Sequence, residues 1–211
     1  MDERSQIRAA SLARYTCLRR YQLKNQRFHQ TAELSVRMTY TAPGHKTFEV
    51  LSEHGLSVIR QKVLRRMLEA EEEASRDDER ARSQITARNY DFELLRSEMW
   101  DGRLTYVLKA TPKAVSKFLL RGRIWVDSED FAILRVEATP AQRPSALIHN
   151  INVVQQYQKI GASWLPLYNR SMSDSFWFGH TDVSIDSSDY QVSQPQQELP
   201  ADQTPGSRST N

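Results

Sequence analysis

The side chains that most often carry catalysis or bind metal ions are few in this sequence and lie far apart. The histidines show neither the HxH nor the HExxH spacing of a zinc site. Cys17 is the only cysteine, so the 211 residues form neither an internal disulfide nor a cysteine-based zinc site. We predict no metal site and no cofactor, with Cys17 as a small, half-buried apolar residue. The histidines, interpreted as exposed or loop residues, are His29, His45, His54, His149 and His180.

Two groups of polar residues have both a chemical and a structural interpretation. Gly44-His45-Lys46-Thr47 shares part of a phosphate-binding loop, but that motif needs a glycine directly before the lysine and a helix after it. Asp127, Glu129 and Asp130 could form a calcium site or an acid and base pair, although acidic residues in a tight turn are more often turn formers. The sequence also lacks a G-x-S-x-G elbow and a dinucleotide fingerprint. We therefore predict no catalytic residue and no enzyme activity.

The positive charge of the chain is concentrated near its start. The net charge is +3, and residues 1–27 carry seven basic side chains against two acidic ones. Such a segment could contact anionic lipid or nucleic acid, but scattered arginines usually form a solvated face. In Arg123-Ile124-Trp125 an aromatic residue lies close to a basic residue, but the sequence lacks the repeated signature of a nucleic-acid-binding module. We predict no nucleic-acid partner and leave peripheral membrane contact open.

Length and composition indicate one globular domain over residues 1–192. Apolar residues make up 39% of the chain and charged residues 26%, with a mean hydropathy of −0.65. No stretch approaches the roughly 18 apolar residues of a membrane-spanning helix. The start, Met1-Asp2-Glu3-Arg4, lacks the apolar core of a secretory signal.

Short segments with a period of two dominate the chain and must position any site. In residues 122–137, Ile124, Val126, Leu134 and Val136 fall on one face, and an acidic turn separates the two halves. This pattern predicts a β-hairpin. Residues 34–40 predict another strand, which pairs with residues 48–50 across a loop at 41–45.

Further strands follow along the chain. Asp101-Gly102 predicts a tight turn between two strands, and prolines at 140–144 interrupt the ladder. The last three predicted strands cover 148–159, 163–178 and 181–192. In the final one, the apolar positions change from odd to even numbers, which predicts a β-bulge near Ser187-Ser188.

Helical periodicity is confined to two regions. Residues 3–18 have a thin apolar stripe without glycine or proline. A helix over 56–82 is predicted with Ile59, Val63 and Met67 on its apolar stripe, while its charge-dense half from Glu71 onward is expected to project into solvent. Residues 193–211, rich in proline, glutamine and serine, are expected to be disordered.

The predicted fold is mainly β with helices (α+β). Roughly nine strands against one or two helices leave part of an apolar sheet face uncovered, so the interior is either a filled core or an apolar cavity. The residues alone favour neither. An acyl chain would suit such a cavity, since each buried CH₂ contributes about 0.8 kcal/mol.

The hairpin motif Gly122-Arg123-Ile124-Trp125-Val126-Asp127, followed by residues 130–137, resembles the outer-membrane lipoprotein-sorting (LolA-like) superfamily, with its LolB-like and RseB N-terminal-like members. Other similar pieces follow in the same order: Tyr106-Val107-Leu108 before Pro112, Gln156-Tyr157 before Trp164-Leu165-Pro166, Phe178-Gly179, and Asp189-Tyr190. The resemblance covers about residues 15–192.

This resemblance implies an incomplete antiparallel β-barrel, a half-barrel, wrapped around one or two helices and enclosing an apolar cavity. The helix carrying Ile59, Val63 and Met67 would be its lid or plug. The residues expected to line the cavity are Leu34, Val36, Met38, Tyr40, Phe48, Val50, Leu104, Tyr106, Leu108, Ile124, Val126, Leu134 and Val136.

The functional hypothesis is a non-catalytic cell-envelope protein that binds lipid or the acyl chains of a lipoprotein. A protein-interaction or envelope-stress sensory module on the same fold is the alternative, and an envelope hydrolase is a remote one. The resemblance implies the periplasm, with a signal segment that has been removed or lies upstream of the given start.

Overall fold

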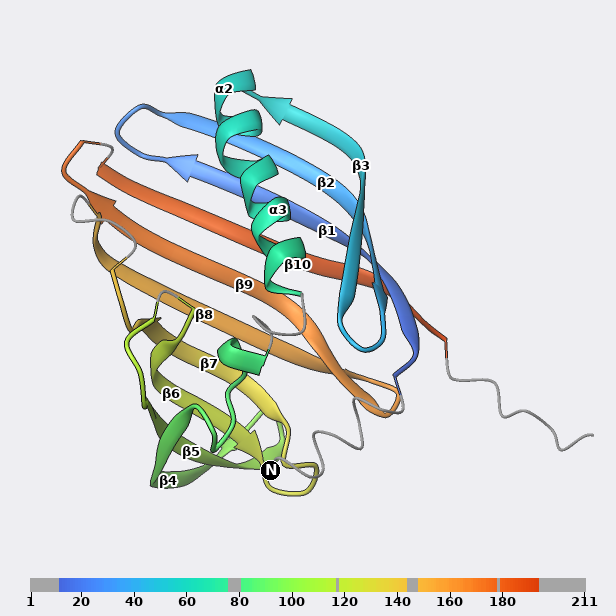
Figure 1. The fold of residues 1–211 in the computed structure, drawn as a ribbon, viewed down its shortest axis with the longest axis vertical. Helices are drawn as coiled ribbons and strands as arrows, with labels where there is room; N and C mark the ends of the chain where they lie inside the picture. The colour runs from blue at the N-terminus through green and yellow to red at the C-terminus, as the bar shows by residue number, and fades with distance from the viewer. Residues whose placement is uncertain (1–11, 76–80, 117, 144–147, 178, 194–211) are drawn as a thin grey trace, which may run out of the picture.

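The computed structural model describes residues 12–75, 81–116, 118–143, 148–177 and 179–193. Ten antiparallel strands form one sheet in the order β3-β2-β1-β10-β9-β8-β7-β6-β5-β4. Within the described residues the sheet is open, since β3 and β4 are its two edges, and the predicted half-barrel architecture with few helices is confirmed (Figure 1). The strands are β1 (Arg14–Asn25), β2 (Gln30–Thr41), β3 (His45–Gly55), β4 (Tyr90–Trp100), β5 (Arg103–Pro112), β6 (Leu120–Asp127), β7 (Ile133–Pro140), β8 (Ile148–Ile160), β9 (Ser163–Ser175) and β10 (Gly179–Ser193).

The first strand corrects the prediction of a helix over residues 3–18. Arg14–Leu18 belong to β1, and residues 3–11 lie outside the described part of the chain. In β1 the odd-numbered side chains are buried and the even-numbered ones are more exposed, which is the period of a strand and not of a helix. β1 lies between β2 and β10, so pairing with both neighbours determines its conformation.

The bulge predicted near Ser187-Ser188 is confirmed. Along β1 and β10, Leu18 faces Ser188 whereas Thr16 faces Gln191, so β10 contains an extra residue between these pairs. Asp189 takes a positive φ of 52° there. The bulge moves the inward positions of β10 from odd to even numbers, as the sequence pattern indicated.

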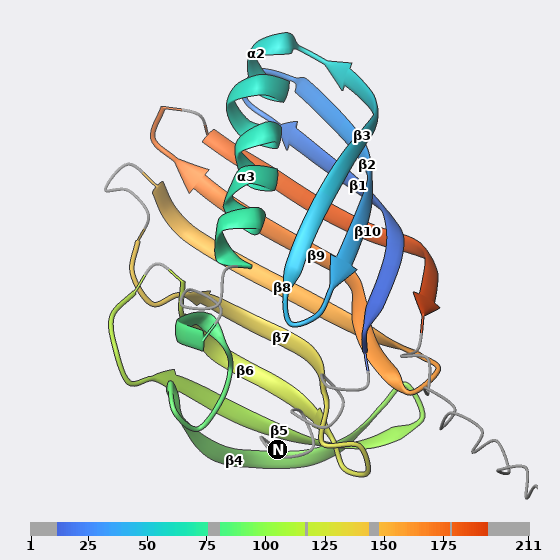
Figure 2. The ribbon, with the colours of Figure 1, turned by 45° about the vertical axis from the view of Figure 1, so that its right-hand side comes forward.

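The predicted lid region is helical and lies on one face of the sheet (Figures 1 and 2). It consists of α2 (Ser57–Ile59), a π-helical turn η1 (Arg60–Leu64) and α3 (Arg65–Ala74). Leu64 and Leu68 are buried against Tyr21, Leu34 and Val36 of the sheet. Residues 76–80 of the predicted helix lie outside the described part, and residues 81–83 are again helical.

A second apolar core forms at the other half of the same sheet. Ile124, Val126 and Val136 of the β6–β7 hairpin pack there with Tyr90 of β4 and with Leu119, which precedes β6. The hairpin predicted from residues 122–137 is confirmed by the pairing of these strands. The predicted strand 163–178 ends at Ser175 in β9, and residues 194–211 of the predicted tail lie outside the described residues. Among the described residues no helix is long and apolar enough to cross a bilayer.

Candidate functional site

A hollow of about 470 Å³ lies between α3 and the middle strands of the sheet. Antiparallel pairing places Gln155, Asn169, Ile185 and Tyr21 in one row across β8, β9, β10 and β1, and directly opposite residues share a face. Its walls combine apolar and polar groups. The lining residues are Arg19, Lys46, Met67, Ala70, Glu71, Phe118, Gln155, Gln156, Tyr157, Pro166, Tyr168, Asn169, Ile185 and Ser187.

A cluster of charged groups forms the wall of this hollow beside α3. Arg19 is 5% exposed, and its Nη1 donates to Oε2 of Glu71 at 2.6 Å. The Tyr21 hydroxyl donates to Oε1 of Glu71 at 2.9 Å, and Nζ of Lys46 lies 3.3 Å from Oε2. The prediction that the segment from Glu71 onward projects into solvent is therefore wrong for Glu71, because this side chain turns back to a buried cation.

Electrostatics explains why the Glu71 carboxyl stays ionised. Burial acts to raise its pKa, but Arg19, Lys46 and the Tyr21 hydroxyl outweigh burial and hold the pKa below its ordinary value. Burial also raises the pKa of Tyr21, which therefore remains a hydroxyl that can donate. The wall beside α3 thus contributes two cations and one carboxylate, and the carboxylate also accepts from the neutral phenol of Tyr21 behind it.

A second hollow, of about 450 Å³, lies where β1 begins and β2 ends. Most of its wall is apolar or aromatic, and the rings of Tyr15 and Tyr40 stack with centroids 4.9 Å apart. Tyr157 and Pro166 line both hollows, so the two are adjacent. The lining residues are Leu12, Tyr15, Tyr40, Gln84, Ala132, Ile133, Tyr157, Ser163, Trp164, Leu165 and Pro166.

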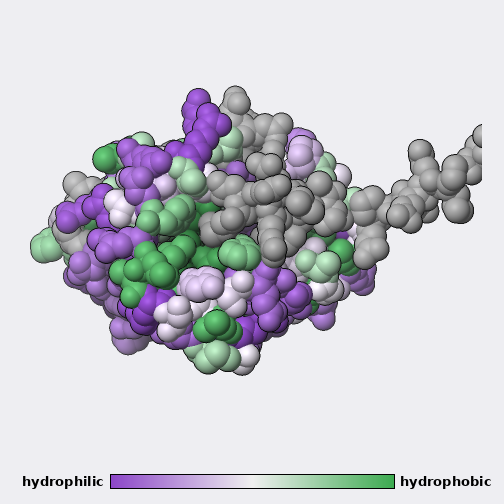
Figure 3. Space-filling model, turned by 90° about the horizontal axis from the view of Figure 1, so that it is seen from below, coloured by the Kyte–Doolittle hydropathy of each residue, from purple (hydrophilic) through white to green (hydrophobic). Residues whose placement is uncertain are grey.

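Apolar side chains also reach the surface at the end of the sheet that β4 and β5 form, at the bottom of Figure 1. Figure 3 looks at this end from below and shows hydrophobic residues gathered in a hollow among hydrophilic ones. On the edge strand β4, Leu94 is 61% exposed and Met99 is 64% exposed, and Leu95 is also exposed. This edge therefore presents apolar surface that the described residues leave uncovered.

The residues predicted to line a cavity fall into three groups. Val50 and Leu104 are exposed, whereas Tyr40, Phe48, Tyr106 and Leu108 are half-buried. Tyr40 lines the second hollow, which we call the apolar hollow. Met67 of the predicted lid lines the first hollow, beside α3, which we call the charged hollow. Ile59, Val63 and Met67 pack on the core that contains Tyr21, Leu34 and Leu64. The third group is buried and comprises Leu34, Val36, Met38, Ile124, Val126, Leu134 and Val136.

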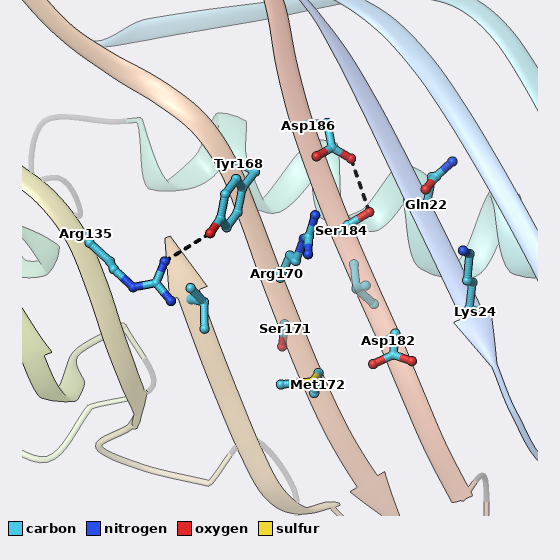
Figure 4. Close-up of a pocket in the computed structure, with 12 residues that line it drawn as sticks. Gln22, Lys24, Arg135, Tyr168, Arg170, Ser171, Met172, Asp182, Ser184 and Asp186 are labelled. Atoms are coloured by element: carbon cyan, nitrogen blue, oxygen red, sulfur yellow. Dashed lines mark hydrogen bonds between the residues drawn. The ribbon is translucent and has the colours of Figure 1, made fainter. Parts of the chain in front are cut away.

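The opposite face of the sheet carries a hollow of about 520 Å³ with a different character (Figure 4). Arg135 donates to the Tyr168 hydroxyl at 3.0 Å, and the Ser184 hydroxyl donates to Asp186 at 3.4 Å. Lys24 and Asp182 add further charges of both signs. Charged and hydroxyl side chains thus form much of the wall of this hollow.

The acidic turn has the structural role favoured by its sequence. Oδ1 of Asp127 accepts from the backbone N–H groups of Glu129 at 3.0 Å and Asp130 at 2.7 Å. Arg103 also binds the Asp127 carboxylate through two nitrogens. Among the described residues, no group of three or more His, Cys, Asp or Glu side chains is placed to hold a metal ion.

Sequence reasoning missed the polar residues of the first hollow. Arg19 occupies an inward position in the alternation of β1, between the buried Cys17 and Tyr21. A charged residue at an inward position is the signal that could have identified it, once β1 was recognised as a strand. Glu71 carries no such signal, because it lies in a run of acidic residues on the helix.

Comparison with known proteins gives one matching family model, over part of the chain, and a set of similar structures. Residues 83–185 match a family described as "Family of unknown function (DUF5686)". No curated protein matches the chain.

Three solved structures are similar to most of the chain. A LolA superfamily protein, NE2245 from Nitrosomonas europaea, is 13% identical over 91% of this chain and 93% of its own, with a TM-score of 0.46. An outer membrane lipoprotein-sorting protein domain from Vibrio parahaemolyticus is 14% identical over 94% and 93%, with a TM-score of 0.41. A DUF1329 family protein from Desulfovibrio piger is 14% identical over 94% and 91%, with a TM-score of 0.48. Lipoprotein-sorting proteins are thus among the structures similar to this chain, as the resemblance predicted.

Proposed function

We propose that this protein binds an acyl-chain amphiphile, a lipid or an acylated lipoprotein, without catalysis, in the cell envelope. The observation that carries the proposal is the contact between the two hollows on the helix face. Tyr157 and Pro166 form a shared wall. On one side the lining residues are mostly apolar or aromatic, and on the other side the lining also includes Arg19, Lys46 and Glu71. An amphiphile has the same division between chain and head group.

The apolar hollow supplies the driving force for binding. Aromatic and aliphatic side chains such as Tyr15, Ile133 and Leu165 form most of its wall. Each CH₂ group transferred from water contributes about 0.8 kcal/mol, so eight of them contribute roughly 6 kcal/mol before the cost of ordering the ligand. A volume of about 450 Å³ is within the range of small-molecule sites.

The helical segment serves as the lid in this proposal. Met67 and Ala70 of α3 line the charged hollow, and Leu64 and Leu68 hold the segment on the sheet. Moving α3 away would widen the hollow but would also part Glu71 from Arg19. Ligand entry is therefore coupled to this buried ion pair.

A second candidate function is a protein-interaction module. The edge strand β4 exposes Leu94, Leu95 and Met99, and an edge strand presents unpaired backbone groups to which a partner strand can add. In this alternative the hollows have no ligand and β4 forms the interface.

One pair of variants separates the two candidates. Ile133→Asp puts a charge into the apolar hollow, and Leu95→Asp puts the same charge on the exposed edge. Native mass spectrometry after incubation with a fluorescent fatty acid measures binding by the full chain, and circular dichroism checks the fold. We expect binding to be lost in Ile133→Asp and kept in Leu95→Asp. Equal binding by folded Ile133→Asp and the wild type would overturn the proposal.

A further inference from the structure

The buried guanidinium of Arg19 is incompletely satisfied. Its Nη1 donates to Glu71, but its Nε has no hydrogen-bond partner among the described residues. The side chain is 5% exposed and belongs to the wall of the charged hollow. A buried donor without a partner is unfavourable, and most such donors in folded proteins bind another group. Nε has almost no accessible surface, so a group in the hollow meets Arg19 at its other lining atoms and reduces the cost of its buried charge.

The charges around this hollow do not cancel. Arg19 and Lys46 are the cations of its wall and Glu71 is its carboxylate, and both cations bind the same oxygen of Glu71. One positive charge therefore remains in excess. Since a buried charge is costly unless paired, this wall favours an anion.

Neutral hydrogen-bonding groups surround the cations. Ser187 lies directly opposite Arg19 in the pairing of β1 with β10, so the two side chains share a face. Gln155 and Asn169 line the same hollow from β8 and β9. Hydroxyl and amide donors beside a guanidinium are the groups that bind carboxylate and phosphate oxygens.

We infer that Arg19 and Lys46 form a head-group site for an anionic amphiphile, whose carboxylate or phosphate lies in the charged hollow while its chain occupies the apolar one. This inference rests on the proposed function and specifies its ligand class. The shared wall at Tyr157 and Pro166 lets one molecule occupy both spaces. The anion pairs with the excess charge, and its oxygens accept from the Arg19 and Lys46 side chains that line the hollow.

The test compares ligands that share a chain and differ in head group. The full chain is titrated by calorimetry with palmitate, with hexadecanol and with palmitoyl lysophosphatidic acid, each below its aggregation concentration. We expect the anionic ligands to bind at least about tenfold more tightly than the alcohol, because a charge-assisted hydrogen bond is stronger than a neutral one. Comparing the affinities of the two anions shows whether the site prefers a carboxylate or a phosphate head group.

Two variants locate the effect. Lys46→Gln removes one cation from a partly exposed position on β3, and Arg19→Gln removes the buried one. Arg37→Gln on neighbouring β2 is the matched control, because Arg37 is an exposed residue paired with Glu49. We expect Lys46→Gln to abolish most of the preference for the anion and Arg37→Gln to keep it. If Arg19→Gln does not fold, the head-group preference of Lys46→Gln alone still tests the site.

The outcomes separate the inference from the proposed function. Equal affinity for palmitate and hexadecanol would overturn the head-group site and leave acyl-chain binding intact. A preference for the anion that persists in folded Lys46→Gln would also overturn the site. Binding of none of the three ligands would overturn both. A preference lost in Lys46→Gln, with the alcohol bound as in the wild type, supports the site.

Discussion

Arg19 of β1 and Glu71 of α3, separated by 52 positions in the chain, form a 2.6 Å ion pair between the sheet and the helix that covers it. The pair lies beside apolar contacts that Leu64 and Leu68 make with the same strands. Apolar packing alone would tolerate several positions of the helix, whereas a buried ion pair requires one. We interpret the pair as setting the position of α3, since buried pairs add little net stability.

Glu71→Gln is expected to destabilise the protein by about 3 kcal/mol. The substitution leaves the charge of Arg19 buried without a carboxylate, and breaking one side of a buried pair typically costs about 3–5 kcal/mol. The amide can still accept from Tyr21, so we expect the lower end of this range. Urea unfolding measures the change. Glu72→Gln, an exposed neighbour, is the control and should change the free energy of unfolding by less than about 0.5 kcal/mol.

The ease of prediction differed between elements for physical reasons. The β6–β7 hairpin and the bulge in β10 were predictable, because apolar alternation and its change of phase are local properties of the sequence. The start of β1 was not, because Arg19 interrupts the apolar alternation and Arg14–Leu18 then fit a helix as well. Arg19 is tolerated inside only because Glu71 reaches it, and that contact is tertiary.

The same distinction applies to the candidate site. Inward faces predicted from alternation did identify buried residues such as Leu34 and Val136. Which parts of an inward face are filled and which remain hollow depends on where α3 crosses the sheet. Periodicity contains no such information, so the adjacent hollows at Tyr157 and Pro166 required the structure.

Asp127 is expected to make stability sensitive to acid. Hydrogen bonds from Arg103 hold its pKa below the ordinary value, and the backbone N–H groups of Asp130 and Glu129 add to this effect. A lowered folded-state pKa stabilises the fold above the unfolded pKa, near 4, and this stabilisation is lost as pH falls through the folded pKa. Urea unfolding between pH 6 and pH 3 should show a smaller loss of stability in Asp127→Asn than in the wild type.

The control for this prediction is Glu129→Gln, in the same turn. Glu129 also contacts Arg103, at 3.0 Å, but its side chain is 79% exposed, and exposed pairs contribute little. We expect the acid dependence of this variant to follow the wild type. An unchanged pH profile for Asp127→Asn would contradict the role assigned to Asp127.

His180 is expected to titrate above the ordinary histidine range. Its Nδ1 lies 2.8 Å from Asp174 and its Nε2 lies 3.1 Å from Asp182, and the hydrogen bond with Asp174 is the main cause of a raised pKa. The resulting stabilisation is present below the unfolded pKa, near 6.5, and is lost as pH rises through the folded pKa. An NMR titration of the imidazole C–H resonance should show a larger fall in this pKa for Asp174→Asn than for Asp182→Asn. An equal pKa of His180 in Asp174→Asn and in the wild type would exclude the hydrogen bond between His180 and Asp174 as its cause.

Gly122→Ala is expected to disrupt the pairing of β6 with β7. A Cβ atom at this position would collide with the carbonyl oxygen of Glu137 and lie 2.6 Å from Cα of Ala138. Both are backbone atoms of the paired strand, so rotation of a side chain cannot relieve the collision. Separating the strands would also disturb Ile124 and Val136 in the second core. We expect a loss of about 3 kcal/mol or more in urea unfolding.

Gly161→Ala provides the comparison, because it tests backbone conformation without a collision. Gly161 has a φ of +59°, and a Cβ atom there would have no neighbour within 4 Å. Alanine in this conformation costs about 1–2 kcal/mol. A larger loss for Gly122→Ala than for Gly161→Ala would therefore measure the close approach of β7 to β6. A loss for Gly122→Ala no greater than that for Gly161→Ala would mean that β7 can move away from β6 at little cost.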